Sequence, residues 1–447
     1  MSRRAVPKAH SAAMRSMEVF RMSRPAVPKA NSTVARRAKG SPVNPLPHLL
    51  YSPLHQRGVT LVELLVALAL SLGVLVGLSA VYIASKQSFR FQETAGRLQE
   101  DGTYALETIA RDLRMAGFAG CKGVDAITIA AVLTYFPTLS MSATSQGGIQ
   151  GPNPLAIVES GNGLVLAQPM TPHNFLRGFD NVPASMFTTA PVTSATDSLF
   201  FSGGSPNTVS VSAAMATPTS PLTVASNPYG WDPTKSYNMI VSNCNTSSLF
   251  AGQINVAGSA IAHDTAVVGS ASVATNAANN FPANATYGID AIVMPLEWNF
   301  YYVATRTGAA TPSLYRVFYD GNERKAAEEV VSNVESMKLH YGENLLGVDT
   351  ATNLPCNLAA GAATCAATMQ SDTWRTTAAA VTDWSRVVAV RVGLMMVSAD
   401  NAANPDVATS MPSLLGLPYI APVGASTTRL RKEFSTTVVV RNRVAAR

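Results

Sequence analysis

One carboxylate in the sequence, that of Glu63, lies beside an apolar run, where a charged group needs a partner. Glu63 directly precedes residues 64–84, a run of 21 residues without a charge. A carboxylate in or near hydrocarbon costs on the order of 2–3 kcal/mol, so it usually has a partner and a function. We therefore expect Glu63 to pair with a cationic group.

The residues around Glu63 indicate which cation that is. The string Arg57-Gly58-Val59-Thr60-Leu61-Val62-Glu63, followed by the apolar run, resembles the class III signal of type IV pilins and pseudopilins. The resemblance implies that a prepilin peptidase cuts between Gly58 and Val59 and methylates the new N-terminus. The Val59 ammonium would then pair with Glu63 of a neighbouring subunit in an apolar filament core. Val59 departs from the family, which usually has Phe or Met at this position.

The apolar run is long enough to cross a bilayer. At 1.5 Å per residue, residues 64–84 span roughly 30 Å. The preceding segment is cationic, so the positive-inside rule keeps it in the cytoplasm and predicts that the chain after Ser85 is exported. The run is too long for a cleaved secretory signal peptide. A plain signal anchor is the remaining alternative, but it does not explain Glu63.

The net charge of +6 comes from the N-terminal segment. Residues 1–58 hold eleven of the 33 Lys and Arg residues and one of the 27 Asp and Glu residues. The remainder has 22 basic and 26 acidic groups, a net charge of −4, so we expect no nucleic-acid partner for it. We expect residues 1–58 to be a cytoplasmic leader peptide that processing removes. A near-repeat at Met1 and Met22 favours a translation start assigned too far upstream.

A helical pattern continues past the apolar run without a proline. Apolar residues recur on one face at Phe91, Leu98, Ala105, Ile109 and Leu113. We predict one helix of about 55 residues, roughly 80 Å long, that ends at a pair of glycines, Gly117 and Gly120. Its residues 59–84 would form the transmembrane and filament-core half, and residues 85–120 an amphipathic half that packs on a head domain. A continuous coiled-coil stalk is the alternative.

Residues 121–447 are predicted to form an extracytoplasmic, β-rich head domain. Period-two alternation predicts strands at 337–341, 388–396 and 434–440, and residues 301–303 with 314–319 are typical of a hairpin. Residues 326–334 have the composition of a helix. The interval 121–290 has only ten charged residues in 170, which suits short strands and long polar loops, with a disordered linker as the alternative.

Strings along the exported chain resemble the PilW family of minor pilins. The first is at residues 97–121, which end in R-D-L-R-M-A-G-F-A-G-C. The others follow in the family's order at residues 242–250, 301–316, 328–342, 384–392 and 434–443. The resemblance implies a pilin-like α+β fold, in which the long N-terminal helix packs on an antiparallel β-sheet head with long polar loops.

Four cysteines permit two disulfide bonds on the oxidising, exported side. Cys356 and Cys365 enclose a short loop, which a local bond would rigidify. A bond between Cys121 and Cys244 would tie the end of the helix to a strand. We expect these two pairs, although four cysteines allow three connectivities.

The sequence contains no recognisable catalytic or metal-binding pattern. Nucleophile-elbow, P-loop and zinc-protease motifs are absent. His173, His263 and His340 are isolated, and Asp349 has neutral neighbours, so neither a zinc nor a calcium site is predicted. We therefore expect no enzymatic activity, no metal and no cofactor.

The family resemblance implies a minor pilin of a Gram-negative type IV pilus. It would enter the inner membrane with its head in the periplasm and then become part of the extracellular pilus. There it would join PilX-, PilV- and FimU-like minor pilins in the complex that primes assembly, stay at or near the tip, and contact the major pilin. A type II secretion pseudopilin is the alternative within the class, and a membrane-anchored extracellular adhesin is the alternative outside it.

Overall fold

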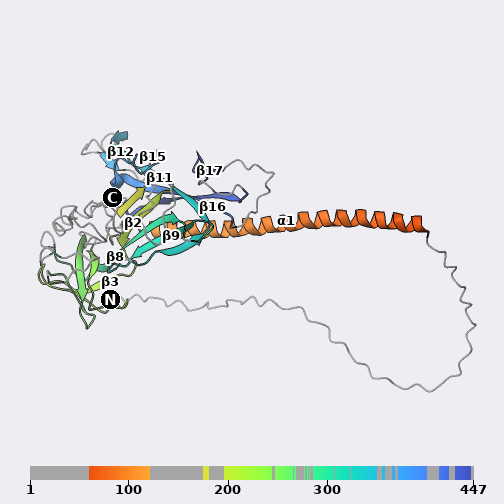
Figure 1. Cartoon of the computed structure of the whole chain (residues 1–447). Helices are drawn as coiled ribbons and strands as arrows, with labels where there is room; N and C mark the ends of the chain where they lie inside the picture. The colour runs from red at the N-terminus through yellow and green to blue at the C-terminus, as the bar shows by residue number, and fades with distance from the viewer. Residues whose placement is uncertain are drawn as a thin grey trace, which may run out of the picture. The chain divides into compact units, whose positions relative to one another are not determined.

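The structure is a computed structural model (Figure 1). It describes residues 60–120, 175–180, 196–243, 247–349, 355–357, 365–367, 371–399, 412–421 and 428–443, apart from 265, 268–275, 277, 278, 280, 282–284, 307 and 324. By internal contacts the chain divides into two units, one up to Leu72 and one from Gly73 onward. The second unit contains all the strands that the structure describes.

A long helix, α1 (Leu61–Leu113), begins the described chain. Its 53 residues agree with the predicted length. Thr60 caps the helix, because its side-chain oxygen accepts a hydrogen bond from the Glu63 amide at 3.2 Å. The helix stops before Gly117, whose φ of 70° lies in the left-handed region that glycine favours at helix ends.

The strands of the head pair in an antiparallel manner throughout the described residues. The largest sheet contains β1 (Leu176–Phe179), β2 (Ser198–Gly204), β3 (Val209–Ala213), β4 (Leu222–Val224), β5 (Tyr237–Ser242), β6 (Ser247–Ile254), β7 (Ala260–Ala262), β8 (Ile292–Ala304), β9 (Ser313–Tyr319) and β10 (Glu328–Ser332). The structure is therefore α+β, as the sequence predicts.

A second sheet has the order β15-β11-β16-β19. It contains β11 (Val334–Glu343), β15 (Thr373–Arg375), β16 (Val387–Val397) and β19 (Arg431–Val439). Two small sheets complete the described strands: β12 (Leu346–Asp349) between β13 (Pro355–Asn357) and β14 (Cys365–Ala367), and β17 (Ser413–Leu414) with β18 (Leu417–Pro418). Short 3-10 turns at Trp384–Arg386 and Arg441–Arg443 flank β16 and β19.

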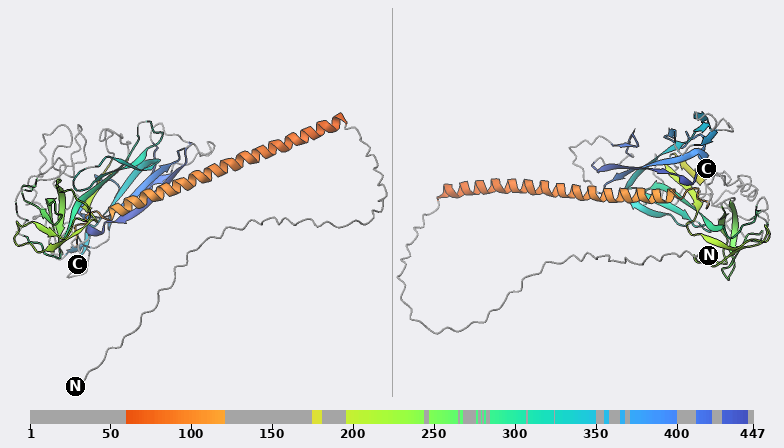
Figure 2. Two further views of the ribbon diagram at one scale, coloured as in Figure 1. Left: turned by 90° about the horizontal axis from the view of Figure 1, so that it is seen from below. Right: turned by 180° about the vertical axis from the view of Figure 1, so that it is seen from behind.

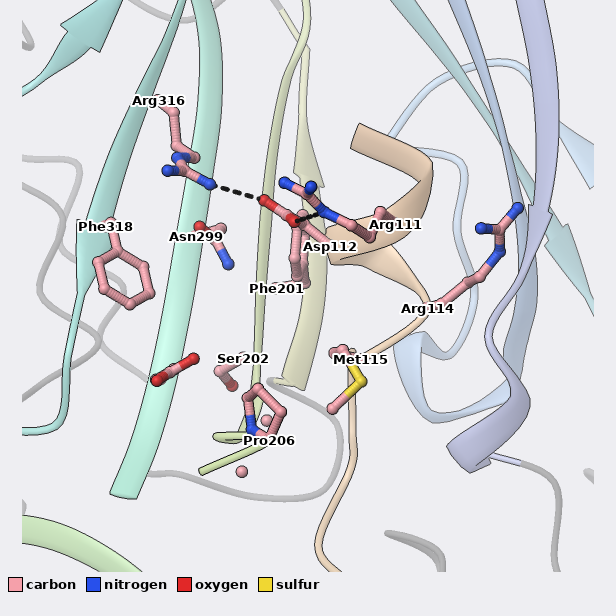
Figure 3. A pocket seen from close by; sticks show the side chains of 13 residues that line it. Arg111, Asp112, Arg114, Met115, Phe201, Ser202, Pro206, Asn299, Arg316 and Phe318 are labelled. Atoms are coloured by element: carbon pink, nitrogen blue, oxygen red, sulfur yellow. Dashed lines mark hydrogen bonds and ion pairs between the residues drawn. The ribbon is translucent and has the colours of Figure 1, made fainter. Parts of the chain in front are cut away.

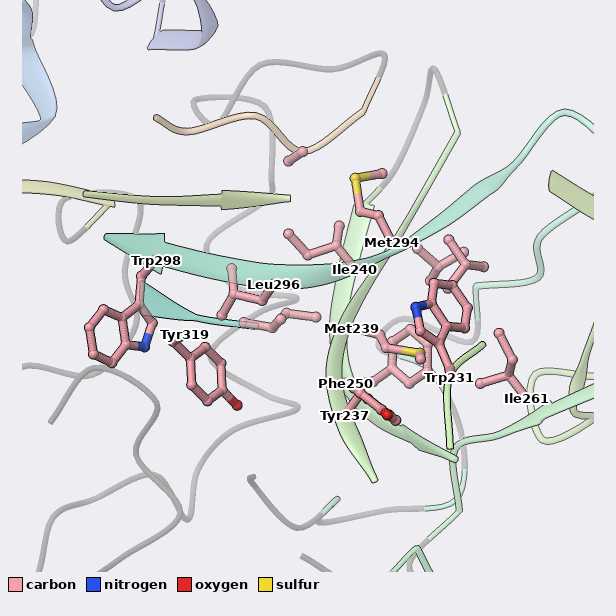
Figure 4. Close-up of a cluster of buried hydrophobic side chains, with 14 of the residues drawn as sticks. Trp231, Tyr237, Met239, Ile240, Phe250, Ile261, Met294, Leu296, Trp298 and Tyr319 are labelled. Carbon is pink, nitrogen blue, oxygen red and sulfur yellow. The ribbon is translucent and has the colours of Figure 1, made fainter. Parts of the chain in front are cut away.

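Six strands of the largest sheet close into a small barrel. The first residues of β8, 292–295, pair with β3 on one side and with β5 on the other. The ring runs from β8 through β3, β4, β7, β6 and β5 and returns to β8. Figure 4 shows Tyr237, Met239, Phe250 and Ile261 gathered among these strands, and all four are buried. A closed ring leaves no unpaired edge, which suits a part of the chain with few charges.

The head has two main apolar cores. One lies in and beside the barrel and includes Trp298 stacked on Tyr319, with ring centroids 5.6 Å apart (Figure 4). The other joins the C-terminal part of α1 to both large sheets. The two views of Figure 2 show this part of α1 beside the blue strands of the second sheet, away from the green strands of the barrel. The helix therefore packs against both large sheets.

Most of the predicted strands are confirmed, and one predicted helix is wrong. Strands β11, β16 and β19 contain the predicted alternations, and β8 pairs with β9 as the predicted hairpin. Residues 326–334 are not a helix, because Glu328–Ser332 form β10 and pair with β9. Asn333 then turns the chain at a φ of 62°, a conformation that asparagine tolerates.

Candidate functional site

The N-terminal end of α1 carries the predicted assembly residue. Glu63 lies in the first turn of the helix, and its side chain is exposed. Thr60 and Glu63 have the spacing of a capping box, which stabilises a helix start. Gly58 and Val59, the residues of the predicted cleavage, lie outside the described residues. The predicted pairing of Val59 with Glu63 of another subunit therefore remains a prediction.

The exposure of α1 changes along its length. Every side chain from Thr60 to Glu93 is exposed, and this part includes a window apolar enough to cross a membrane. Burial begins at Leu98, and the face that continues through Ile109 and Leu113 is fully buried. Phe91 was expected on the same face but is exposed, so the buried stripe starts one heptad later than predicted. Two kinds of surface, one fully apolar and one amphipathic, thus share a single helix.

Close packing fixes the helix on the second sheet. Gly102 lies directly against the ring of Phe434 on β19, since a Cβ at this position would be 2.6 Å from the ring. One turn earlier, the amine of Lys432 donates to the Gln99 side chain at 2.5 Å. After the helix, the Asn442 amide donates to the carbonyl oxygen of Arg114 at 3.1 Å. The last strand and the turn after it therefore hold α1 from Gln99 to its end.

A charged network ties the end of α1 to the largest sheet. The carboxylate of Asp112 accepts hydrogen bonds from the Tyr301 hydroxyl at 2.6 Å and from the Arg316 guanidinium at 2.9 Å. Arg316 also donates to Glu328 on β10 at 2.6 Å. Burial and the neighbouring Asp112 raise the pKa of Tyr301 well above its usual range, so the hydroxyl stays protonated and remains a donor. Asp112 on the helix thus joins β8 and β9, and Arg316 extends the network to β10.

A cleft opens beside this network, between the end of α1 and strands β2, β8 and β9 (Figure 3). Its volume is about 530 Å³, within the range of ligand sites. Figure 3 shows Asp112 directed toward Arg316 and Arg111, while Arg114 points away from them. Met115, Pro206 and Phe318 supply apolar walls, and Glu297 and Asn299 of β8 also line the cleft. The cleft therefore combines apolar walls with charged and polar side chains.

Neither Asp112 nor Glu297 was singled out as a site residue from the sequence. Asp112 belongs to the R-D-L-R string, and its partners Tyr301 and Arg316 belong to another string that resembles the same family. The sequence therefore contained a signal that these three residues act together. Glu297 had no such signal, because a glutamate between strand residues is ordinarily solvated.

The four cysteines are only partly placed. Cys121 and Cys244 lie outside the described residues, and so do the side chains of Cys356 and Cys365. The backbone puts Cys356 in β13 opposite Gly347, and Cys365 in β14 opposite Asp349. The predicted disulfide bonds therefore remain predictions. No group of three potential metal ligands occurs among the described residues.

Comparison with known proteins tests the resemblance. Residues 300–442, from within β8 to the turn after β19, match the model of the PilW family, described as type IV pilus-assembly protein W. No curated protein and no solved structure matches the chain. The matched residues include Tyr301 and Arg316, which hold Asp112, and Phe434, which packs on α1. The resemblance that the sequence predicted is thus confirmed over residues 300–442, where the chain is similar to the PilW family of type IV pilus assembly.

Proposed function

We propose that this protein is a minor pilin whose role is structural rather than enzymatic. The exposed apolar part of α1 would anchor the precursor in the inner membrane, with the head in the periplasm, and would later join the helices of the filament core. The head would contact neighbouring heads. The observation that carries this proposal is the division of α1 into an exposed apolar part and a part buried in a PilW-like head.

Processing would convert the precursor into the assembling form. Cleavage between Gly58 and Val59 removes the cationic leader and creates an ammonium on Val59. Glu63 is exposed at the first turn of the helix, where a neighbouring subunit's ammonium can reach it. Because an unpaired carboxylate in an apolar core is costly, this pair would set the register between adjacent helices.

The proposed partners follow from the family. The protein would join PilX-, PilV- and FimU-like minor pilins in a complex that primes assembly and remains at or near the tip, and it would contact the major pilin. The family match favours a pilus over a type II secretion system. The barrel precedes the matched residues and is poor in charge, so it is the place where an adhesin function, the second candidate, would reside.

Piliation of a deletion strain tests the proposal. The strain should lose surface pili, and the wild-type gene should restore them. Glu63→Ala should be produced and processed but should not restore pili, whereas Glu107→Ala, which changes an exposed residue of the same helix, should restore them. Normal pili in the Glu63→Ala strain would contradict the pairing role. Normal pili without the gene, together with loss of surface binding, would support the adhesin instead.

A further inference from the structure

The cleft beside the end of α1 contains a carboxylate without a cation. Glu297 lies on β8 in the floor of the cleft, and no Lys, Arg or His of the described chain forms an ion pair with it. Its hydrogen bond comes from the neutral Ser205 hydroxyl. Burial raises the pKa of Glu297 above its usual range, and Asp320 and Asp112 raise it further, while the Ser205 bond and the more distant Arg316 offset the rise only in part. A half-buried carboxylate in this state is stabilised by a cation that enters the cleft.

None of the described arginines around the cleft forms an ion pair with Glu297. Arg316 is engaged by Asp112 and Glu328, and Arg111 is bound to the other oxygen of Asp112 at 3.2 Å. Arg114 points away in Figure 3. Arg316 and Arg111 are thus paired with carboxylates other than Glu297, and Arg316 acts on Glu297 only from beyond ion-pair distance.

A second acceptor lies next to Glu297. Asn299 is two residues further along β8, so its side chain is on the same face of the sheet. Its Oδ1 atom is buried and has no hydrogen-bond partner among the described residues. Buried acceptors in folded proteins are almost always satisfied. Two adjacent side chains of the cleft thus have acceptor capacity, and a donor that enters from outside reaches the buried Asn299 oxygen when that side chain turns toward the cleft.

The walls suit the stem of a long cationic side chain. Met115, Pro206 and Phe318 line the cleft, and none of them is fully buried. The face of an aromatic ring attracts cations, and Phe318 already has the Arg316 guanidinium 5.8 Å from its centroid. A methylene stem would cover apolar surface here while its charged end reached the floor.

From these observations we propose that the cleft receives an arginine side chain of a partner polypeptide, whose guanidinium binds Glu297 and Asn299. The planar fork of arginine presents several donors at once, which matches two neighbouring acceptors better than the point charge of lysine. The site defines a docking surface on the head, at the end of α1. The inference goes beyond the proposed function, because it requires neither cleavage of a leader nor a position at the pilus tip.

Peptide binding to the purified full chain in detergent micelles tests this proposal. The probes are acetyl-Gly-Arg-Gly-amide and acetyl-Gly-citrulline-Gly-amide, which differ by a charged guanidinium and a neutral urea. Calorimetric titration should show saturable binding of the arginine peptide, with a Kd at least about tenfold lower than that of the citrulline peptide.

Variants locate the binding and control for folding. Glu297→Gln keeps the shape of the side chain but removes its charge, and it should raise the Kd of the arginine peptide by at least about tenfold without lowering the Tm. The same exchange at an exposed helix position, Glu107→Gln, should change neither value. Equal affinity for both peptides, an unchanged Kd in Glu297→Gln, or no saturable binding would overturn the proposal. A lowered Tm with unchanged peptide binding would assign Glu297 a purely structural role.

Discussion

Replacement of Asp112 should loosen the head from its helix. The carboxylate is 12% exposed and is the acceptor for both Tyr301, which is fully buried, and Arg316. Asp112→Ala leaves the buried Tyr301 hydroxyl without a partner, which costs about 1–3 kcal/mol. Arg316 keeps Glu328, so the loss of its second partner should add about 1 kcal/mol. We therefore expect Asp112→Ala to lower the free energy of unfolding by about 2–4 kcal/mol.

Denaturant unfolding of the full chain in detergent measures this loss. Tryptophan fluorescence is a suitable signal, because one of the four tryptophans, Trp298, is buried and lies three positions from Tyr301 on the same strand. Glu107→Ala is the matched control, since it removes an exposed carboxylate from the same helix, and it should change the free energy by less than about 0.5 kcal/mol.

A double-mutant cycle assigns the loss to the hydrogen bond. Asp112→Ala and Tyr301→Phe should each destabilise the head, and the double variant should be less destabilised than their sum by about 1–2 kcal/mol. Additive effects, or an Asp112→Ala variant as stable as Glu107→Ala, would refute the claim that this network holds the helix to the sheet.

Three further changes test separate parts of the structure. Gly102→Ala should be less stable than Gly96→Ala by at least about 1 kcal/mol in the same unfolding assay. The reason is that a methyl group at Gly102 meets the Phe434 ring, whereas a methyl group at Gly96 meets open space. Equal stabilities of the two variants would contradict this packing. Burial lowers the pKa of His263, so the unfolded chain takes up a proton first and Tm should fall as pH drops below about 6.5. His263→Phe should weaken that dependence, and an unchanged pH profile would contradict it. Peptide mapping without reduction should recover the two predicted disulfide bonds, and any other pairing would reject them.

The long helix was predictable because its signals are local. The apolar run and the 3.6-residue period are read within a few turns, and the glycines that end the helix are adjacent to it. The error at Phe91 has a physical cause: the period continues along the sequence, but the buried face begins only where the sheets reach the helix, at Leu98. The sequence pattern does not contain that boundary.

Most strands in the second half of the head could also be predicted from the sequence. Strands β11 and β16 bury long alternating stretches of apolar residues, which is a strong local signal. Residues 326–334 were misassigned because their alanines and glutamates favour a helix. Pairing with β9, supported by Glu328 bonded to Arg316, overrides that preference.

The barrel and the cleft could not be predicted, because both depend on long-range pairing. Closure requires β3 and β5 to meet the same residues of β8, although β3 and β8 are separated by several other strands. The position of Glu297 beneath the end of α1 likewise results from the register of β2 with β8, which places Gly203 opposite Glu297. No local pattern in the sequence specifies either arrangement.

The N-terminal residue of the exported protein tests the central claim most directly. Intact-mass and N-terminal peptide mass spectrometry should be applied to protein from piliated cells. A type IV pilus subunit with a class III signal should begin with N-methylated Val59. An intact leader, or a start at Val81 as left by a secretory signal peptidase, would contradict the account.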